Sequence, residues 1–188
     1  ALKIKPDYAE AYNNMGNALK DKGDLEAAIG SFNKALKIKP DYAEAYNNIG
    51  NALKDTDDLE AAIDSFNKAL NIRPDYVDAY NNLGAVLQDK GDLDAAINSY
   101  QQALKIKPDY AEAHYNMGNA LKDKGDPEAA IGSFNKALKI KPDYAEAYNN
   151  MANALKDKGD FEASIDSYTK ALKIKPDYAE AHNNMGNA

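Results

Sequence analysis

Few side chains in this sequence could carry out catalysis. The chain has two histidines and no cysteine, and a catalytic site needs a base close to a nucleophile or a metal. His114 and His182 are far apart in the sequence, at places where equivalent segments carry tyrosine, so we interpret them as packing variants. The glycines are scattered and form no phosphate-binding loop. We therefore expect neither enzyme activity nor a bound cofactor.

The acidic run Asp55-Thr56-Asp57-Asp58 is a second candidate for ligand chemistry. A calcium-binding loop would continue with a glycine and end in a glutamate, and both are missing here. We interpret the run as a turn followed by a helix cap. The sequence therefore predicts no metal site.

Asparagine occurs at regular helical spacing. Asn13, Asn14 and Asn17 lie on the polar face of a predicted helix, and the pattern recurs along the chain. Each such asparagine costs roughly 0.5 kcal/mol relative to alanine, so the pattern opposes folding. A carboxamide has two donors and an acceptor oxygen, and can bind the backbone of an extended peptide whatever its sequence. We predict a peptide-binding face made of Asn13, Asn14, Asn17, Asn47, Asn48, Asn51, Asn81, Asn82, Tyr115, Asn116, Asn119, Asn149, Asn150, Asn153 and Asn184.

A proline recurs every 34 residues and divides the chain into similar repeats. A fixed period of this length predicts a stacked array, because one repeat cannot bury its apolar faces alone. We expect a single domain over residues 1–188, with residues 1–8 ending a preceding second helix and residues 179–188 forming part of a first helix. The full repeats are 9–42, 43–76, 77–110, 111–144 and 145–178.

Each repeat has the apolar periodicity of two amphipathic helices. In the first repeat we place these helices at about residues 8–21 and 25–38. Asp7 with Glu10 predicts a capping box on the first helix, and Asp24 predicts the cap of the second.

Small residues and proline mark the turns and the close contacts. Gly23 suits a turn with positive φ, and repeat two has Asp57 at this place, so we expect strain there. Gly16 and Ala28 are predicted to face each other inside a hairpin, where Ala152 and Ser164 stand in repeat five. The extra proline of repeat four, Pro127, falls at a first helical position, where proline is tolerated.

These repeats resemble the tetratricopeptide family in length and in the types of their key residues. The family pattern is an aromatic, leucine-glycine, a large residue, alanine, an aromatic, alanine and proline. It is matched here by Tyr12, Met15, Gly16, Leu19, Ala28, Phe32, Ala35 and Pro40. Tyr12 replaces the usual tryptophan. The resemblance implies an all-α, right-handed superhelical solenoid of antiparallel helix pairs, with a concave groove for extended peptides.

The asparagines are similar to those lining the superhelix of the O-linked N-acetylglucosamine transferases, where such residues hold substrate polypeptides. That resemblance implies a ladder of Asn14, Asn48, Asn82, Asn116, Asn150 and Asn184. Recent duplication is an open alternative, because repeats one and four differ at only three places. An exposed place on the second helix nevertheless varies from Gly30 to Asp64 and Asn98, whereas the ladder does not vary.

The ladder's neighbours are less regular. Tyr115 replaces an asparagine in repeat four, and Ala85-Val86 replaces Asn-Ala in repeat three. An aromatic anchor among polar groups is typical of a binding hot spot. A tolerated surface tyrosine is the alternative.

The net charge is −7, from 23 basic and 30 acidic side chains that are interleaved along the chain. Nucleic acid is not an expected partner, because such binding needs a basic stripe. No apolar run reaches the roughly 20 residues of a membrane span, so we expect a soluble, cytoplasmic protein without membrane contact. Repeats two and three are the most acidic, which favours a basic or mixed-charge ligand.

We therefore expect a scaffold that binds extended segments of partner proteins. One alternative is the substrate-recognition arm of a larger, glycosyltransferase-like enzyme. A designed or recently duplicated array without a dedicated ligand is a further alternative. Uncapped terminal helices also predict end-to-end self-association at high concentration.

Overall fold

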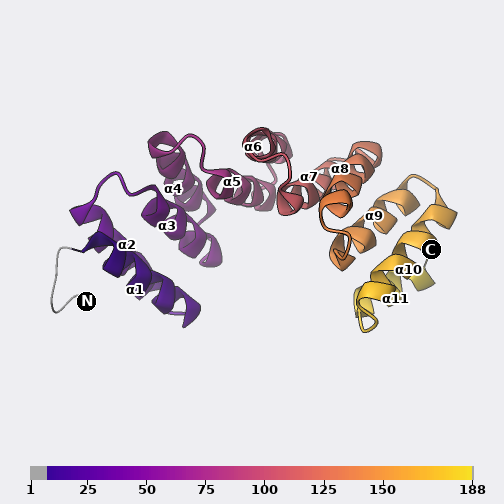
Figure 1. The fold of residues 1–188 in the computed structure, drawn as a ribbon, viewed down its shortest axis with the longest axis horizontal. Helices are drawn as coiled ribbons and strands as arrows, with labels where there is room; N and C mark the ends of the chain where they lie inside the picture. The colour runs from indigo at the N-terminus through magenta and orange to yellow at the C-terminus, as the bar shows by residue number, and fades with distance from the viewer. Residues whose placement is uncertain (1–7, 188) are drawn as a thin grey trace. The chain divides into compact units, whose positions relative to one another are not determined.

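The computed structural model describes residues 8–187, which form eleven α-helices joined by short turns (Figure 1). The first two, α1 and α2, confirm the helices predicted at about residues 8–21 and 25–38. The helix bounds are α1 Ala9–Asp21, α2 Leu25–Ile38, α3 Ala43–Asp55, α4 Leu59–Ile72, α5 Val77–Asp89, α6 Leu93–Ile106, α7 Ala111–Asp123, α8 Pro127–Ile140, α9 Ala145–Asp157, α10 Phe161–Ile174 and α11 Ala179–Gly186.

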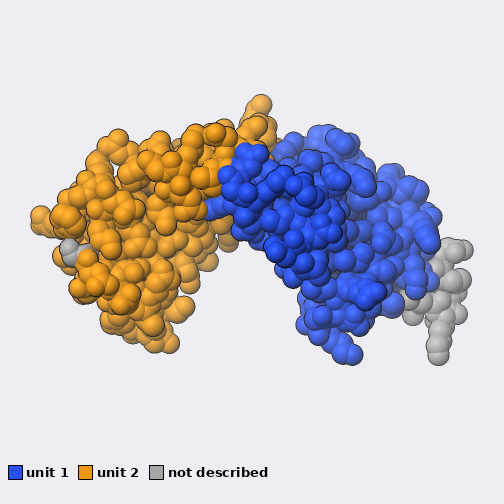
Figure 2. Space-filling view, turned by 180° about the vertical axis from the view of Figure 1, so that it is seen from behind, with its two compact units in different colours: residues 1–92 blue, residues 93–188 orange. Residues whose placement is uncertain are grey.

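The chain divides into two compact units, residues 1–92 and residues 93–188 (Figure 2). Unit 1 contains α1 to α5, and each of these helices packs on the next. Unit 2 contains α6 to α11, packed in the same sequential way. First helices of successive repeats also touch directly, as α1 with α3 and α3 with α5 in unit 1, and α7 with α9 in unit 2. A single domain over the whole chain remains a prediction.

Alanines and one aromatic ring per hairpin form the core of both units. Phe32, Phe66 and Phe134 are completely buried. A methyl group on Gly50 would lie 2.7 Å from the Phe66 ring, so glycine is needed for the ring to approach the first helix. The equivalent ring in repeat one lies against Gly16, because the atoms nearest to a Cβ placed there belong to Phe32.

Repeat five packs a buried aromatic ring against alanine instead of glycine. Ala152 replaces the glycine and packs in one cluster with the buried ring of Tyr168. The Ser164 hydroxyl donates to the Ala152 carbonyl oxygen at 2.8 Å, and the Tyr168 hydroxyl donates to Asn153 Oδ1 at 2.5 Å. Each buried hydroxyl therefore has an acceptor, as burial of a polar group requires.

The predicted caps of the second helices are confirmed. Asp24 Oδ1 accepts from the Ala27 N–H at 3.2 Å, and Asp58 Oδ1 accepts from the Ala61 N–H at 3.3 Å. Pro127 is the first residue of α8, as predicted.

The first helices of the described residues begin without a side-chain cap from their N-cap residue. Tyr8 is the N-cap residue of α1 and Tyr42 that of α3, and neither side chain caps its helix. Asp7 lies outside the described residues, so the capping box predicted for Asp7 with Glu10 stays a prediction. A tyrosine cannot accept these bonds as a short side-chain oxygen does, so backbone groups close the first turn instead, as in the bond from the Ala45 N–H to the Tyr42 carbonyl.

The turn inside the hairpin takes positive φ in repeats one to five. Gly23, Gly91, Gly125 and Gly159 each have φ of +86°, and Asp57 has φ of +62°. A side chain at positive φ brings Cβ close to the backbone, so the strain predicted for repeat two is located at Asp57.

Candidate functional site

The predicted peptide-binding face lies on the first helices, and burial divides its asparagines into two sets. Asn13, Asn47 and Asn149 are buried, with exposed fractions of 6%, 5% and 0%. The asparagines at the next place of each repeat are more accessible: Asn14 is exposed, and the half-buried members are Asn48, Asn82, Asn116, Asn150 and Asn184. We call the first set the buried asparagines and the second set the outer asparagines. Asn17, Asn51, Asn81, Asn119 and Asn153 are also half-buried.

In unit 1, a carboxamide pair links each first helix to the next. The Asn48 amide donates to Asn13 Oδ1 at 3.0 Å, and the Asn82 amide donates to Asn47 Oδ1 at 3.1 Å. A buried acceptor without a partner would cost about 1–3 kcal/mol. Asn13 and Asn47 therefore link successive repeats, and they hold Asn48 and Asn82 in place.

In unit 2, Tyr115 stands where repeats one, two and five have a buried asparagine. Its hydroxyl accepts from the Asn150 amide at 3.0 Å, and the same amide donates to Asn119 Oδ1 at 2.8 Å. The Tyr115 ring packs 4.8 Å from the Tyr144 ring and 6.1 Å from the Phe134 ring, measured between centroids. Burial raises the pKa of the Tyr115 hydroxyl, so it is protonated at neutral pH.

The buried side chain of Asn149 forms hydrogen bonds through its amide hydrogens and its oxygen. Its amide donates to Asn150 Oδ1 and to Glu180 Oε1, both at 3.1 Å. Its own Oδ1 accepts from the Asn184 amide at 3.4 Å. Because both amide hydrogens are used inside the protein and the side chain is fully buried, Asn149 has no accessible group for a ligand.

The sequence pattern did not separate these two sets, although one signal was present. Adjacent residues on a helix point about 100° apart. Asn13 and Asn14 therefore cannot both face a ligand in the same way, and the one closer to the apolar stripe is buried.

The acidic residues of this face are paired in part. Arg73 donates to Glu44 at 2.7 Å, and the Arg73 guanidinium lies 3.5 Å from the centre of the Tyr76 ring. Glu146 lies 3.8 Å from Lys175. These partly exposed pairs reduce the negative charge that a peptide would meet beside the outer asparagines.

The two histidines make equivalent bonds in different surroundings. His114 Nε2 lies 3.0 Å from the Pro108 carbonyl oxygen, and His182 Nε2 lies 2.9 Å from that of Pro176. A carbonyl can only accept, so Nε2 is the protonated nitrogen in both rings. His114 is buried, whereas His182 is exposed.

Within residues 8–187, no three side chains that could bind a metal ion lie together. None of the helices described there is long and apolar enough to cross a bilayer.

Comparison with known proteins identifies the repeat. The family described as TPR repeat matches residues 16–57, 50–91, 86–125, 118–159 and 152–188. Solved structures of similar fold include YrrB, described as a TPR protein with an unusual peptide-binding site, at 26% identity and a TM-score of 0.78 over 98% of this chain and 95% of that chain. They also include MamA, at 28% identity and a TM-score of 0.79 over 92% of this chain and 94% of that chain.

A shorter match leads to a curated relative. A probable UDP-N-acetylglucosamine–peptide N-acetylglucosaminyltransferase SEC of Arabidopsis thaliana is 59% identical over 29 residues. These residues are 15% of this chain and only 3% of that protein. The repeat matches, which span most of the sequence, show that the chain belongs to the tetratricopeptide repeat family and has its fold of sequential antiparallel helix pairs.

Proposed function

We propose that the chain is a protein-interaction scaffold that binds extended segments of partner proteins across the outer asparagines. The observation that carries the proposal is the bond from each of Asn48 and Asn82 to a buried asparagine of the preceding repeat. This bond uses one amide hydrogen and leaves the other hydrogen and the oxygen of the carboxamide for a ligand.

Anchored carboxamides are suited to peptide binding for an energetic reason. A free side chain loses about 0.5–1.5 kcal/mol of conformational entropy when a ligand immobilises it. Asn48 and Asn82 are already fixed by the neighbouring repeat, so they lose less. A peptide backbone presents donors and acceptors at every residue, and a carboxamide can satisfy either kind. The expected binding is therefore tolerant of peptide sequence.

The similarity to YrrB supports this proposal, since that protein is described as having a peptide-binding site and its chain is covered almost completely. Tyr115 belongs to the same proposed face. Its half-buried ring and bonded hydroxyl make it a rigid anchor, and we expect Tyr115→Ala to weaken binding by about tenfold, as for a hot-spot aromatic.

The test uses peptides selected on an unbiased peptide array and three double variants of the chain. Asn48→Ala with Asn82→Ala removes the outer carboxamides and should weaken binding by about tenfold, the equivalent of two modest hydrogen bonds. Asn33→Ala with Asn67→Ala, exposed positions on α2 and α4, should leave binding unchanged.

Asn13→Ala with Asn47→Ala breaks the same inter-repeat bonds from the buried side while keeping the outer carboxamides. It should lower the melting temperature but weaken binding less than the outer double variant does. Equal loss of binding in both would mean that stability, and not contact, is responsible, and would contradict the proposal.

A second candidate is the substrate-recognition arm of a larger glycosyltransferase-like enzyme, favoured by the 59% identity over 29 residues with the Arabidopsis thaliana protein. The two candidates share the same binding face. Reading the gene on both sides of this segment distinguishes them, because only the second requires an adjoining catalytic region.

A further inference from the structure

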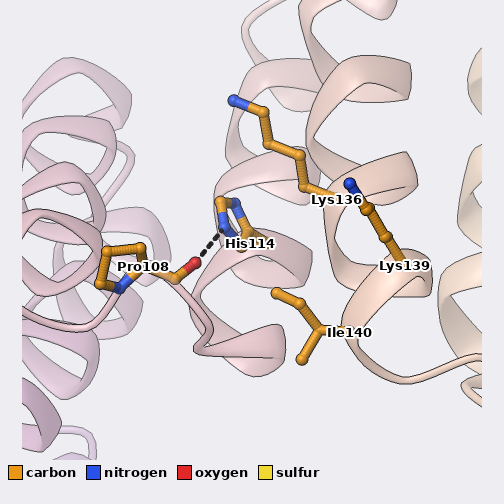
Figure 3. Close-up of a pocket in the computed structure, with 5 residues that line it drawn as sticks. All are labelled: Pro108, His114, Lys136, Lys139 and Ile140. Atoms are coloured by element: carbon orange, nitrogen blue, oxygen red, sulfur yellow. Dashed lines mark hydrogen bonds between the residues drawn. The ribbon is translucent and has the colours of Figure 1, made fainter.

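Unit 2 contains a pocket of about 330 Å³ that the proposed peptide-binding face does not use. Its lining consists of Pro108 in the loop before α7, His114 on α7, and Lys136, Lys139 and Ile140 at the end of α8. Figure 3 shows His114 between the Pro108 loop and the α8 side chains. Two ammonium groups thus stand beside a surface formed by a ring, a proline and an isoleucine.

The pocket is explained by the type of residue at position 114. The equivalent residues of repeats one and two are Tyr12 and Tyr46. There a lysine ammonium lies 5.9 Å from the tyrosine ring centre, Lys34 over Tyr12 and Lys68 over Tyr46. Lys136 is the equivalent lysine in repeat four. Histidine is smaller than tyrosine, so the lysine is retained while part of the aromatic volume is missing.

His114 also has an unmet hydrogen-bonding group. Its exposed fraction is 7%, and its Nε2–H donates to the Pro108 carbonyl. Its Nδ1 is buried and has no partner among the described residues. Burial lowers the pKa of the ring, the positive charge of Lys136 lowers it further, and the bond to Pro108 opposes both effects. The ring is therefore neutral at pH 7, and the electrostatic environment is positive.

We propose that this pocket binds a small aromatic acid, meaning one planar ring that carries a carboxylate. The ring would take the volume that tyrosine fills in repeats one and two, and would restore an aromatic face beneath the Lys136 ammonium. The carboxylate would pair with Lys136 or Lys139. An apolar cavity with a few convergent polar groups is the usual form of a small-ligand site.

Such an acid could be a free metabolite or the C-terminal phenylalanine of a peptide, since both present a ring and a carboxylate. Phenylacetate and a short peptide ending in phenylalanine are the two probes. The chain has only two histidines, so the ring proton signals of His114 and His182 report binding directly by NMR. Assignment follows from His182→Tyr, which removes one signal.

Both probes should shift the His114 signals in a saturable way and leave those of His182 in place. His114→Tyr fills the pocket and should abolish binding as measured by saturation transfer to the ligand, while the melting temperature stays the same or rises. His182→Tyr makes the matching change at an exposed site and should bind as the parent does. Lys136→Gln, which introduces the residue type that repeat three has at Gln102, should weaken binding about two- to fivefold, as for an exposed ion pair.

Binding of the peptide alone would assign the source to protein C-termini, and binding of phenylacetate would show that the ring and carboxylate suffice. Undiminished binding to His114→Tyr, or no saturable shift with either probe, would overturn the proposal. Neither result depends on the outer asparagines. The aromatic-acid proposal is therefore tested independently of the proposed peptide-binding face.

Discussion

Units 1 and 2 are built from the same repeat but complete some of their buried contacts with different groups. Unit 1 places Phe66 against Gly50 and joins its first helices with pairs of carboxamides. Unit 2 keeps one glycine–phenylalanine contact, at Gly118, and one carboxamide pair, from Asn184 to Asn149. It also places Tyr168 in a cluster with Ala152 and uses the Tyr115 hydroxyl as the acceptor between α9 and α7. The helix bounds are nevertheless equivalent. The helix positions thus depend on small and apolar residues, whereas polar contacts can be exchanged if every buried group keeps a partner.

The largest expected effect breaks the glycine–aromatic contact. Gly50→Ala places a methyl group 2.7 Å from the Phe66 ring, and overpacking a rigid core should lower the free energy of unfolding by about 3 kcal/mol. Chemical denaturation measures this change. Gly30 is a suitable control, because its Cβ would meet nothing within 4 Å, and Gly30→Ala should stabilise the helix by about 0.5–1 kcal/mol. Similar results for both glycines would show that the ring contact is unimportant.

The next prediction compares the two kinds of hydrogen bond between successive first helices, the asparagine pair of unit 1 and the tyrosine–asparagine bond of unit 2. Asn47→Ala removes a buried acceptor in unit 1 and should cost about 1–2 kcal/mol, since Asn47 is buried and the Asn82 amide loses its partner. Tyr115→Phe removes only a hydroxyl in unit 2 and should cost about 0.5–1 kcal/mol. The smaller cost is expected because Asn150 keeps its bond to Asn119 and the ring stays packed on Tyr144.

Double-mutant cycles sharpen this comparison. Denaturation of Asn47→Ala, Asn82→Ala and the double variant gives the coupling energy of the unit 1 pair, and Tyr115→Phe with Asn150→Ala gives that of the unit 2 pair. A larger coupling in unit 2 would contradict the order proposed here.

The sequence predicts well those features that depend on one residue and its local backbone. Gly23 and Asp24 fix the turn and the cap through a positive φ and a short side-chain acceptor, and both requirements are local. The partner of Asn13 could not be predicted in this way, because it is Asn48, 35 positions further on. That contact depends on how the next repeat is rotated and stacked.

The pocket beside His114 was not predicted either. Its volume results from the size difference between histidine and tyrosine within a packing environment that three separate segments create. The histidine was visible as a substitution in the sequence. The space around it depends on where the end of α8 lies.

A smaller effect concerns the turn of repeat two. Asp57 adopts φ of +62°, where glycine stands in the other full repeats. Asp57→Gly should stabilise the protein by about 0.5 kcal/mol, because relief of the left-handed conformation exceeds the added entropy of the unfolded chain. Gly125→Ala makes the opposite change in unit 2 and should destabilise by about 1 kcal/mol. Thermal unfolding distinguishes the two signs.

The smallest effect concerns a missing ion pair at the same turn. Turn lysines of later repeats reach back to an acid of the preceding repeat, as Lys90 to Glu60 at 2.6 Å, Lys124 to Asp94 at 2.5 Å and Lys158 to Glu128 at 2.8 Å. Repeat two has Thr56 instead of lysine, which donates to the Leu53 carbonyl at 2.8 Å. Thr56→Lys would place an ammonium within reach of the exposed carboxylate of Glu26.

Since these pairs are exposed, the gain should be at most about 0.5 kcal/mol and should be offset in part by the lost threonine bond. The ion pair is therefore tested by the salt dependence of the stabilisation and not by its size. The difference in melting temperature between Thr56→Lys and the parent should shrink as salt is raised from low to about 1 M, where screening reaches only about 3 Å. Adding Glu26→Gln should remove that salt dependence. If the salt dependence remains after Glu26→Gln, the new lysine pairs with another acid. Repeats one and two would then lack the lysine–acid contact that links the later repeats.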